Sequence, residues 1–183
     1  MKELKVVDLM VPLSEYATVS EDATLYEAVL ELEKAQEEFD HTRYRHRAIL
    51  VMDHDGKVLG KLTQLDALKA LEPKYDNMLE RERSHQLGFT KAFMKSMLKN
   101  EHLFASPLEN LCLNAGKQNV KNHMHTLSEG EYIAEEASLD QAIHQLVMGY
   151  HQSLLVTRKG SISGVLRLTD VFAAVYHTMR ECF

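Results

Sequence analysis

The chain has 183 residues, 45% of them hydrophobic, which is enough apolar side chain to build the core of one domain or of two small ones. Every apolar run is shorter than the roughly 18 residues that a membrane-spanning helix needs, and residues 1–13 lack the apolar stretch of a secretory signal, so we expect a cytoplasmic protein without a membrane partner. A formal net charge of −6 argues against nucleic acid as the partner, because nucleic-acid binding depends on neutralising many phosphates.

The first predicted helix begins at a capping box. Thr24 and Glu27 have the spacing at which a hydroxyl and a carboxylate each bind a free backbone N–H at a helix start. One face of this helix should be buried, because apolar residues follow at i, i+3, i+4 and i+7: Leu25, Ala28, Val29 and Leu32.

A basic cluster follows this helix and consists of Arg43, Arg45, His46 and Arg47. Four such side chains within five residues can hold one small polyanion even on an acidic protein. They can also form a solvated turn, and local charge alone favours that interpretation.

Two short strands and a helix complete the first unit. Residues 48–52 and 58–62 are apolar runs rich in strand formers, and the turn residues between them predict a β-hairpin. A helix should begin around Thr63 to Asp66, with Leu65 and Leu68 as core contacts.

The middle of the chain, residues 73–118, should be helical, because a structureless loop of this length is unusual in a compact protein. Apolar residues spread among charged ones predict one or two amphipathic helices across residues 76–103. Ser106 and Pro107 have the residue types of a helix start, and Gly116 can end the short helix that follows. This insert could be a lid, a dimer contact or a docking surface, or it could pack onto its own module.

The unit of the first part then occurs a second time. Residues 19–29 match residues 133–143 at a shift of 133 − 19 = 114, and Ser138 with Gln141 repeats the capping box. Strands are predicted again at residues 153–156 and 162–166, and a last helix at Thr169. Together these elements predict an α/β (α+β) fold with two β-α-β-β-α repeats, at residues 1–72 and 119–183, and a helical insert at 73–118.

Each second hairpin strand ends in a recurring motif. Residues 60–66 read Gly-Lys-Leu-Thr-Gln-Leu-Asp and residues 164–170 read Gly-Val-Leu-Arg-Leu-Thr-Asp. The motif resembles the signature G-x-x-[ST]-x-x-D of the CBS (cystathionine-β-synthase) domain family, and the resemblance covers roughly residues 1–71 and 119–180. It implies two repeats packed about a pseudo-twofold axis, with clefts that bind adenosine-containing ligands such as AMP, ADP, ATP or S-adenosylmethionine.

The resemblance also assigns roles in the first repeat. Asp66 would accept the ribose hydroxyls and Thr63 would face a phosphate, although both residues would also be useful as a helix cap without any ligand. His46 and Arg47 match the basic pair that precedes the hairpin in nucleotide-binding members, so Arg47 would bind a phosphate.

The second repeat departs from this pattern. His151 is followed by Gln152 where the first repeat has an arginine, and Arg167 stands where the signature has Ser or Thr. Asp170 is retained, so a ribose site is conceivable there, while Arg167 could contact a phosphate or simply fill the cleft. We therefore expect inequivalent clefts and favour the one with Thr63 and Asp66.

The function that follows is a regulatory adenine-nucleotide sensor that acts through a homodimer or a separate protein partner. The alternative is a ligand-free interaction scaffold, which the altered second repeat favours. We expect no enzyme, since no catalytic triad, P-loop or paired-acid motif stands out, and no metal requirement, since His123 and His125 lack a third ligand. Cys112 and Cys182 should be reduced, packed thiols.

Overall fold

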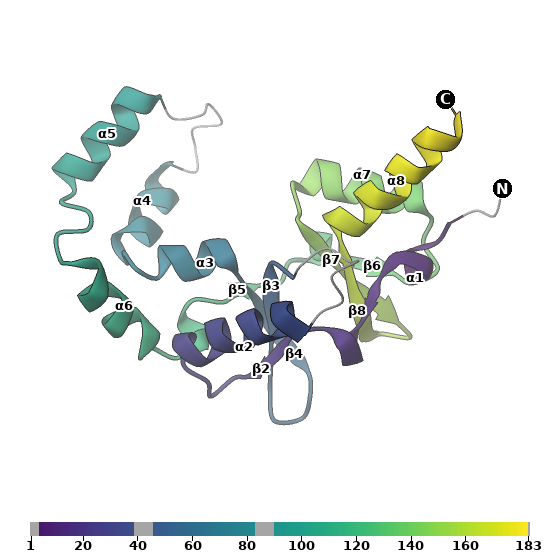
Figure 1. The fold of residues 1–183 in the computed structure, drawn as a ribbon, viewed down its shortest axis with the longest axis horizontal. Coiled ribbons are helices and arrows are strands. Elements are labelled where there is room, and N and C mark those ends of the chain that lie inside the picture. Colours follow the sequence, from purple (N-terminus) through teal and green to yellow (C-terminus); the bar gives the residue numbers. More distant parts are fainter. Residues whose placement is uncertain (1–3, 39–45, 83–89, 183) are drawn as a thin grey trace.

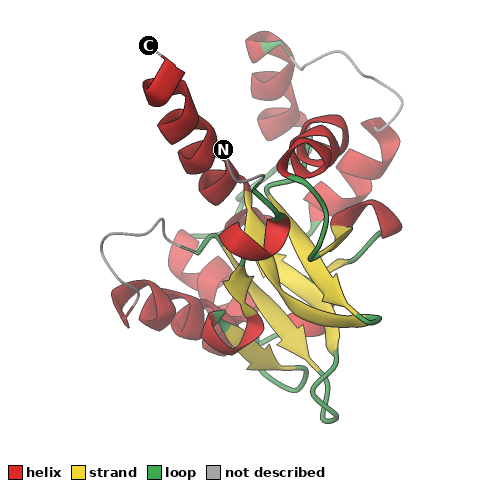
Figure 2. Cartoon of the chain, turned by 90° about the vertical axis from the view of Figure 1, so that its right-hand side faces the viewer, coloured by secondary structure: helices red, strands yellow, loops and turns green. Residues whose placement is uncertain are grey.

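Two four-stranded sheets form the centre of the molecule, and helices cover their outer faces (Figures 1 and 2). The computed structural model describes residues 4–38, 46–82 and 90–182. Arg43 and Arg45 of the predicted basic cluster lie outside these residues. The α/β fold with two repeats and a helical insert is confirmed.

The first sheet has the order β2-β3-β4-β5, with β2 parallel to β3 and the other neighbours antiparallel. Its strands are Thr18–Ser20, Ala48–Met52, Val58–Thr63 and His125–Thr126. Helices α2 (Leu25–Glu38) and α3 (Gln64–Lys69) belong to the same half.

The second sheet has the order β1-β8-β7-β6 and repeats this arrangement. Its strands are Val11–Pro12, Ser161–Arg167, Ser153–Arg158 and Tyr132–Ala134, in that order. Helices α1 (Val6–Leu9), α7 (Leu139–Gly149) and α8 (Leu168–Cys182) belong to this half, and α8 projects from it at the C-terminal end (Figure 1).

The two halves exchange their leading strands. β1 precedes the first repeat in the chain but pairs with β8 of the second, whereas β5 precedes the second repeat and pairs with β4 of the first. The motif glycines permit this exchange: a Cβ at Gly60 would lie 2.7 Å from the carbonyl oxygen of His125, and one at Gly164 would meet the carbonyl oxygen of Val11. The reciprocal exchange relates the two halves by an approximate twofold axis.

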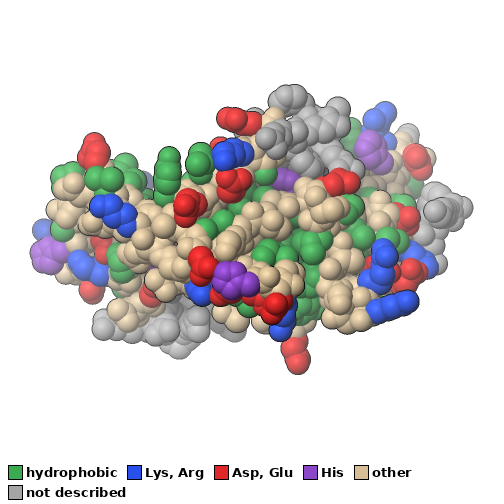
Figure 3. All heavy atoms as spheres, turned by 90° about the horizontal axis from the view of Figure 1, so that it is seen from below, with side chains coloured by type: hydrophobic (Ala, Val, Ile, Leu, Met, Phe, Trp, Pro, Cys, Tyr) green, Lys and Arg blue, Asp and Glu red, His purple; other side chains and the backbone are tan. Residues whose placement is uncertain are grey.

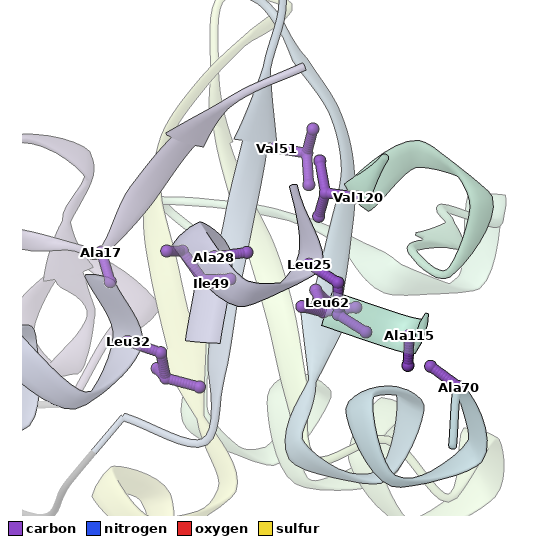
Figure 4. Packing of buried hydrophobic residues seen from close by; sticks show 10 residues of the cluster. All are labelled: Ala17, Leu25, Ala28, Leu32, Ile49, Val51, Leu62, Ala70, Ala115 and Val120. Atoms are coloured by element: carbon purple, nitrogen blue, oxygen red, sulfur yellow. The ribbon is translucent and has the colours of Figure 1, made fainter. Parts of the chain in front are cut away.

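Three apolar clusters form the core. One lies between α2 and the first sheet, where Leu25, Ala28 and Leu32 pack with Ile49 and Leu62 (Figure 4). A second occupies the equivalent place in the other half. The third joins the two sheets and contains residues from both: Val11, Tyr16, Leu50, Val58, Leu155 and Val165. Both repeats therefore contribute to the third cluster, and each also has a cluster of its own.

The insert forms three helices, α4 (Lys74–Glu82), α5 (Lys91–Asn100) and α6 (Leu108–Gly116), which extend to one side of the first half (Figure 1). Ala115 of α6 is buried in the first core cluster, so this end of the insert packs onto the module itself. The short helix was predicted to begin at Ser106 and Pro107, but it begins one residue later with Pro107 as its N-cap.

Five residues that were predicted to be packed are exposed. Leu65 and Leu68 are 61% and 62% exposed, because α3 turns Ala67 and Ala70 toward the core instead. Val29 at the edge of the α2 stripe is also exposed. Cys112 and Cys182 are free thiols as expected, but both are exposed instead of packed.

Candidate functional site

A cavity of about 300 Å³ lies between the two repeats and is lined by both of them. The first repeat contributes side chains from the ends of β3 and β4 and the start of α3, and the second repeat contributes the equivalent positions of β7, β8 and α8. The lining residues are Tyr16, Arg47, Ala48, Lys61, Thr63, Gln64, Leu65, Gln152, Ser153, Arg167 and Thr169. Three of the predicted site residues, Arg47, Thr63 and Arg167, are among them.

The edge of the cavity in the first repeat is a capping box at the start of α3. Thr63 donates from its backbone N–H and its hydroxyl to Asp66 Oδ2, at 3.0 and 2.6 Å, and its Oγ1 accepts from the Asp66 N–H at 3.1 Å. Lys69 Nζ lies 3.7 Å from the other carboxylate oxygen. Thr63 thus lines the cavity while Asp66 stands directly behind it and does not line it.

An ion pair takes the place of this box in the second repeat. Arg167 donates from Nε and Nη2 to the two carboxylate oxygens of Asp170, both at 2.6 Å. The Arg167 side chain is almost fully buried and forms part of the cavity wall. Asp170 lies behind Arg167, as Asp66 lies behind Thr63, and is not among the lining residues.

The predicted basic pair separates into two environments. Arg47 is exposed at the cavity, and its carbonyl oxygen accepts from the Gln64 N–H at 3.1 Å. His46 is only 1% exposed and packs edge-on against Tyr16, with ring centroids 4.6 Å apart. Burial, with a smaller contribution from the nearby Arg167 guanidinium, lowers the pKa of His46 from 6.5 to about 4. His46 is therefore a neutral wall residue next to the cavity.

His151 lies away from the other predicted site residues. It lines a separate, open pocket of about 640 Å³ beside α7 and β6, together with Tyr132, His144 and Gln145. Gln145 donates to the carbonyl oxygens of Gly130 and Tyr132 and so fixes the wall of that pocket. The structure thus brings six of the seven predicted residues to or directly behind the cavity, and places His151 elsewhere.

Sequence reasoning missed Tyr16 and Lys61. Tyr16 is buried beside the cavity, and burial raises its pKa well above the usual value, so its hydroxyl stays protonated. Lys61 lies on β4 inside the signature motif, between the buried residues Gly60 and Leu62. A charged residue within a buried strand was the available signal for Lys61, whereas nothing in the sequence around Tyr16 indicated its place.

Other kinds of site find little support in the described residues. They contain no group of three His, Cys, Asp or Glu side chains placed to share a metal ion. Among the described side chains visible in Figure 3, basic and acidic groups are interspersed, so this face has no continuous basic stripe of the kind that binds nucleic acid. Within residues 4–38, 46–82 and 90–182, every helix falls short of the length or the apolar character that a membrane-spanning segment requires.

Comparisons with known proteins agree with this architecture. Residues 6–73 match the family model described as CBS domain. A comparison with curated protein sequences gave no match.

Solved structures resemble the whole chain. The CBS-pair protein CBSX2 from Arabidopsis thaliana has a TM-score of 0.61 at 17% identity, with 98% of this chain and 99% of that chain covered. A structure of CBSX2 in complex with AMP has a TM-score of 0.58 at 16% identity, covering 96% and 98%. The CBS-domain containing protein ATU1752 from Agrobacterium tumefaciens has a TM-score of 0.57 at 19% identity, covering 93% and 90%. Residues 6–73 thus match the CBS domain model, and the whole chain has the fold of a tandem CBS-domain pair.

Proposed function

We propose that this CBS pair is a regulatory module, not an enzyme, and that it binds an adenine nucleotide in the cavity between its repeats. The observation that carries the proposal is the lining of this cavity. Arg47 and Arg167 face it from opposite repeats, Thr63 adds a hydroxyl, and none of the lining residues described carries a carboxylate. Such a lining favours AMP, ADP or ATP over the cationic S-adenosylmethionine. A structural neighbour, CBSX2, has been crystallised in complex with AMP.

The individual roles follow from the positions of the side chains. Arg47 is exposed at the cavity and would bind a phosphate, with Thr63 beside it. Asp66 would accept the ribose hydroxyls through Oδ1, because Oδ2 already accepts two hydrogen bonds from Thr63. Arg167 would contact the phosphate from the opposite wall while Asp170 holds its guanidinium in place.

Regulation would act through the packing of the two repeats. A ligand held by residues of both repeats stabilises one arrangement of them over others, which a second subunit or a protein partner can detect. Large apolar side chains lie exposed on α8, namely Phe172, Tyr176 and Met179. Exposed apolar surface of this kind supports a homodimer as the assembly that responds to the ligand, and we propose that this homodimer is cytoplasmic.

Thermal unfolding in the presence of AMP, ADP, ATP and S-adenosylmethionine tests the proposal. A ligand at 100 times its Kd stabilises the folded state by about 2.7 kcal/mol, which raises the Tm by roughly 5–10 °C for a chain of this size. The proposal predicts this shift for at least one phosphate-containing compound and none for S-adenosylmethionine. Light scattering on the protein eluted from a size-exclusion column, with and without the active compound, measures the molar mass and so the presence of the dimer.

A ligand-free scaffold is the second candidate, and one observation favours it. Both motif carboxylates already have partners in the structure, Asp66 with Thr63 and Asp170 with Arg167. If neither pair rearranges, both carboxylate oxygens of Asp170 stay bound to Arg167, and Asp66 offers a ribose only Oδ1. The absence of any thermal shift across the four compounds, with a stable dimer present, would identify the scaffold.

A further inference from the structure

A buried polar network crosses from one repeat to the other beside the cavity. Lys61 Nζ on β4 lies 2.5 Å from Glu131 Oε1, and the two side chains are 9% and 2% exposed. Glu131 Oε2 accepts from the backbone N–H and the hydroxyl of Ser128, at 2.9 and 3.0 Å, and lies 2.8 Å from His125 Nε2. Burial alone would raise the pKa of Glu131, but these hydrogen bonds and Lys61 outweigh it and lower the pKa to about 2. Glu131 is thus an anion that faces the Lys61 ammonium.

In the second half of the molecule, the position equivalent to Lys61 is uncharged. Lys61 pairs across the sheet edge with His125, and the equivalent pair in the second sheet is Val165 with Val11, both buried. The fold therefore needs no ion pair at this position. A buried ion pair is also a poor source of stability, because the loss of hydration of two charges offsets most of their attraction.

The ammonium of Lys61 also has more N–H donors than the neighbouring described residues have acceptors for it. It carries three N–H groups, yet Glu131 is its single acceptor among the described residues. Polar groups as buried as this are normally hydrogen-bonded, so the remaining donors call for acceptors. Lys61 lines the cavity between the repeats, and the cavity is where such acceptors can be placed.

We propose that Lys61 binds an anionic group of the ligand, a phosphate, from inside the cavity. This inference rests on the proposed function, because it concerns the same cavity. The contact with Lys61 would make the cavity select phosphorylated ligands over adenosine. Lys61 joins Arg47 and Arg167 as a third cation on the cavity wall, and it differs from both in being linked to Glu131 of the other repeat. A phosphate bound to Lys61 would therefore act directly on the contact between Lys61 and Glu131, which joins the two repeats.

The sharpest test compares Glu131→Gln with the double variant Lys61→Met/Glu131→Gln by calorimetry. Both variants lack the ion pair. Glu131→Gln keeps the buried Lys61 ammonium without its carboxylate, and the double variant removes the ammonium as well, so a difference between the two reports the ammonium of Lys61. The probes are AMP, adenosine and inorganic pyrophosphate. We expect the double variant to bind AMP and pyrophosphate about tenfold to a hundredfold more weakly than Glu131→Gln, and adenosine equally well.

A structural role for Lys61 predicts a different pattern. If only the ion pair mattered, Glu131→Gln would weaken AMP binding as much as the double variant does. Equal AMP affinities of the two variants would therefore overturn the inference. Equal loss of AMP and adenosine would overturn it as well.

The pyrophosphate titration separates this inference from the proposed function. Binding of pyrophosphate that depends on Lys61, without binding of any adenine compound to the wild-type chain, would leave Lys61 as an anion site and reject the nucleotide. If AMP binds with the same affinity whether or not Lys61 is present, the nucleotide site stands and the role of Lys61 is rejected. If the wild-type chain binds none of the probes, both fail.

Discussion

Arg167 and Asp170 stand three residues apart where β8 passes into α8, and two hydrogen bonds of 2.6 Å join the guanidinium to the carboxylate. The first repeat has Thr63 and Asp66 at the same two positions, joined by the hydroxyl. In both repeats the acid of the signature motif is thus held by the residue three places before it. The second repeat uses a buried guanidinium for this, and the guanidinium lines its side of the cavity.

The Arg167–Asp170 pair should be important for stability. Asp170→Ala leaves the Arg167 guanidinium buried without its carboxylate, and breaking a buried pair in this way costs about 3–5 kcal/mol. Glu136→Ala is the control, because it breaks the exposed Lys5–Glu136 pair, for which we expect less than about 1 kcal/mol. Equilibrium unfolding in urea measures both losses, and similar values for the two variants would show that burial does not matter here.

Asp66 should have a role in binding beyond its role as a helix cap. Thr24 and Glu27 form the same kind of box at the start of α2, with hydrogen bonds of 2.7, 2.9 and 3.2 Å. Neither of these two residues lines the cavity, whereas the box of Asp66 includes the lining residue Thr63. Asp66→Ala and Glu27→Ala should therefore each lower the unfolding free energy by about 0.5–2 kcal/mol.

Only Asp66→Ala should also weaken AMP binding, by about tenfold or more, because it removes the acceptor for the ribose hydroxyls. Calorimetric titration with AMP compares the two variants with the wild-type chain. Identical AMP affinities for Asp66→Ala and Glu27→Ala would show that Asp66 serves only as a helix cap.

His46 should make the fold sensitive to mild acid. The pKa of this histidine is about 4 in the folded chain and about 6.5 when unfolded, so the unfolded state binds more protons between these values. Its contribution is present in full above about pH 6.5 and is lost as the pH falls toward 4, by about 2 kcal/mol at pH 5. Urea unfolding at pH 7.5 and pH 5 should show this loss in the wild-type chain and a smaller loss in His46→Leu. Equal losses would mean that His46 is not the group responsible.

The fold was predictable from the sequence because its signals are local and occur twice. The capping boxes, the apolar runs of the hairpins and the amphipathic stripes each depend on residues within one element, and repetition at a fixed spacing reinforced them. The exchange of β1 and β5 was not predictable, since two-residue strands carry no periodic pattern. Leu65 and Leu68 were misplaced because a helix of six residues is too short for its apolar spacing to define a face.

The site was predictable only in part for a similar reason. The signature motif located Thr63, and the basic pair before the hairpin located Arg47; both residues line the cavity. The Lys61–Glu131 contact joins residues seventy positions apart and depends on how the two repeats pack, which the spacing of residues along one chain does not encode. The position of His151 depends on the turn after α7, where Tyr150 takes a left-handed conformation with φ of 52°.

The motif glycines should be required for the exchanged strands. A methyl group at Gly60 would meet the backbone of β5, and one at Gly164 would meet the backbone of β1; neither strand can move without breaking the sheet pairing. Gly60→Ala and Gly164→Ala should each cost about 1–3 kcal/mol. Gly116→Ala is the control, since its methyl group would lie 3.4 Å from the Tyr26 Cβ in ordinary contact. Thermal unfolding of the three variants ranks them, and a Gly116→Ala loss as large as the others would contradict this reason for the glycines.

A crystal structure of the chain grown with AMP tests the central claim most directly. We predict AMP between the repeats, with its phosphate in hydrogen-bond contact with Arg47 or Arg167 and its ribose hydroxyls on Asp66. AMP bound on any other surface, or an empty cavity at a concentration that saturates binding in solution, would contradict it.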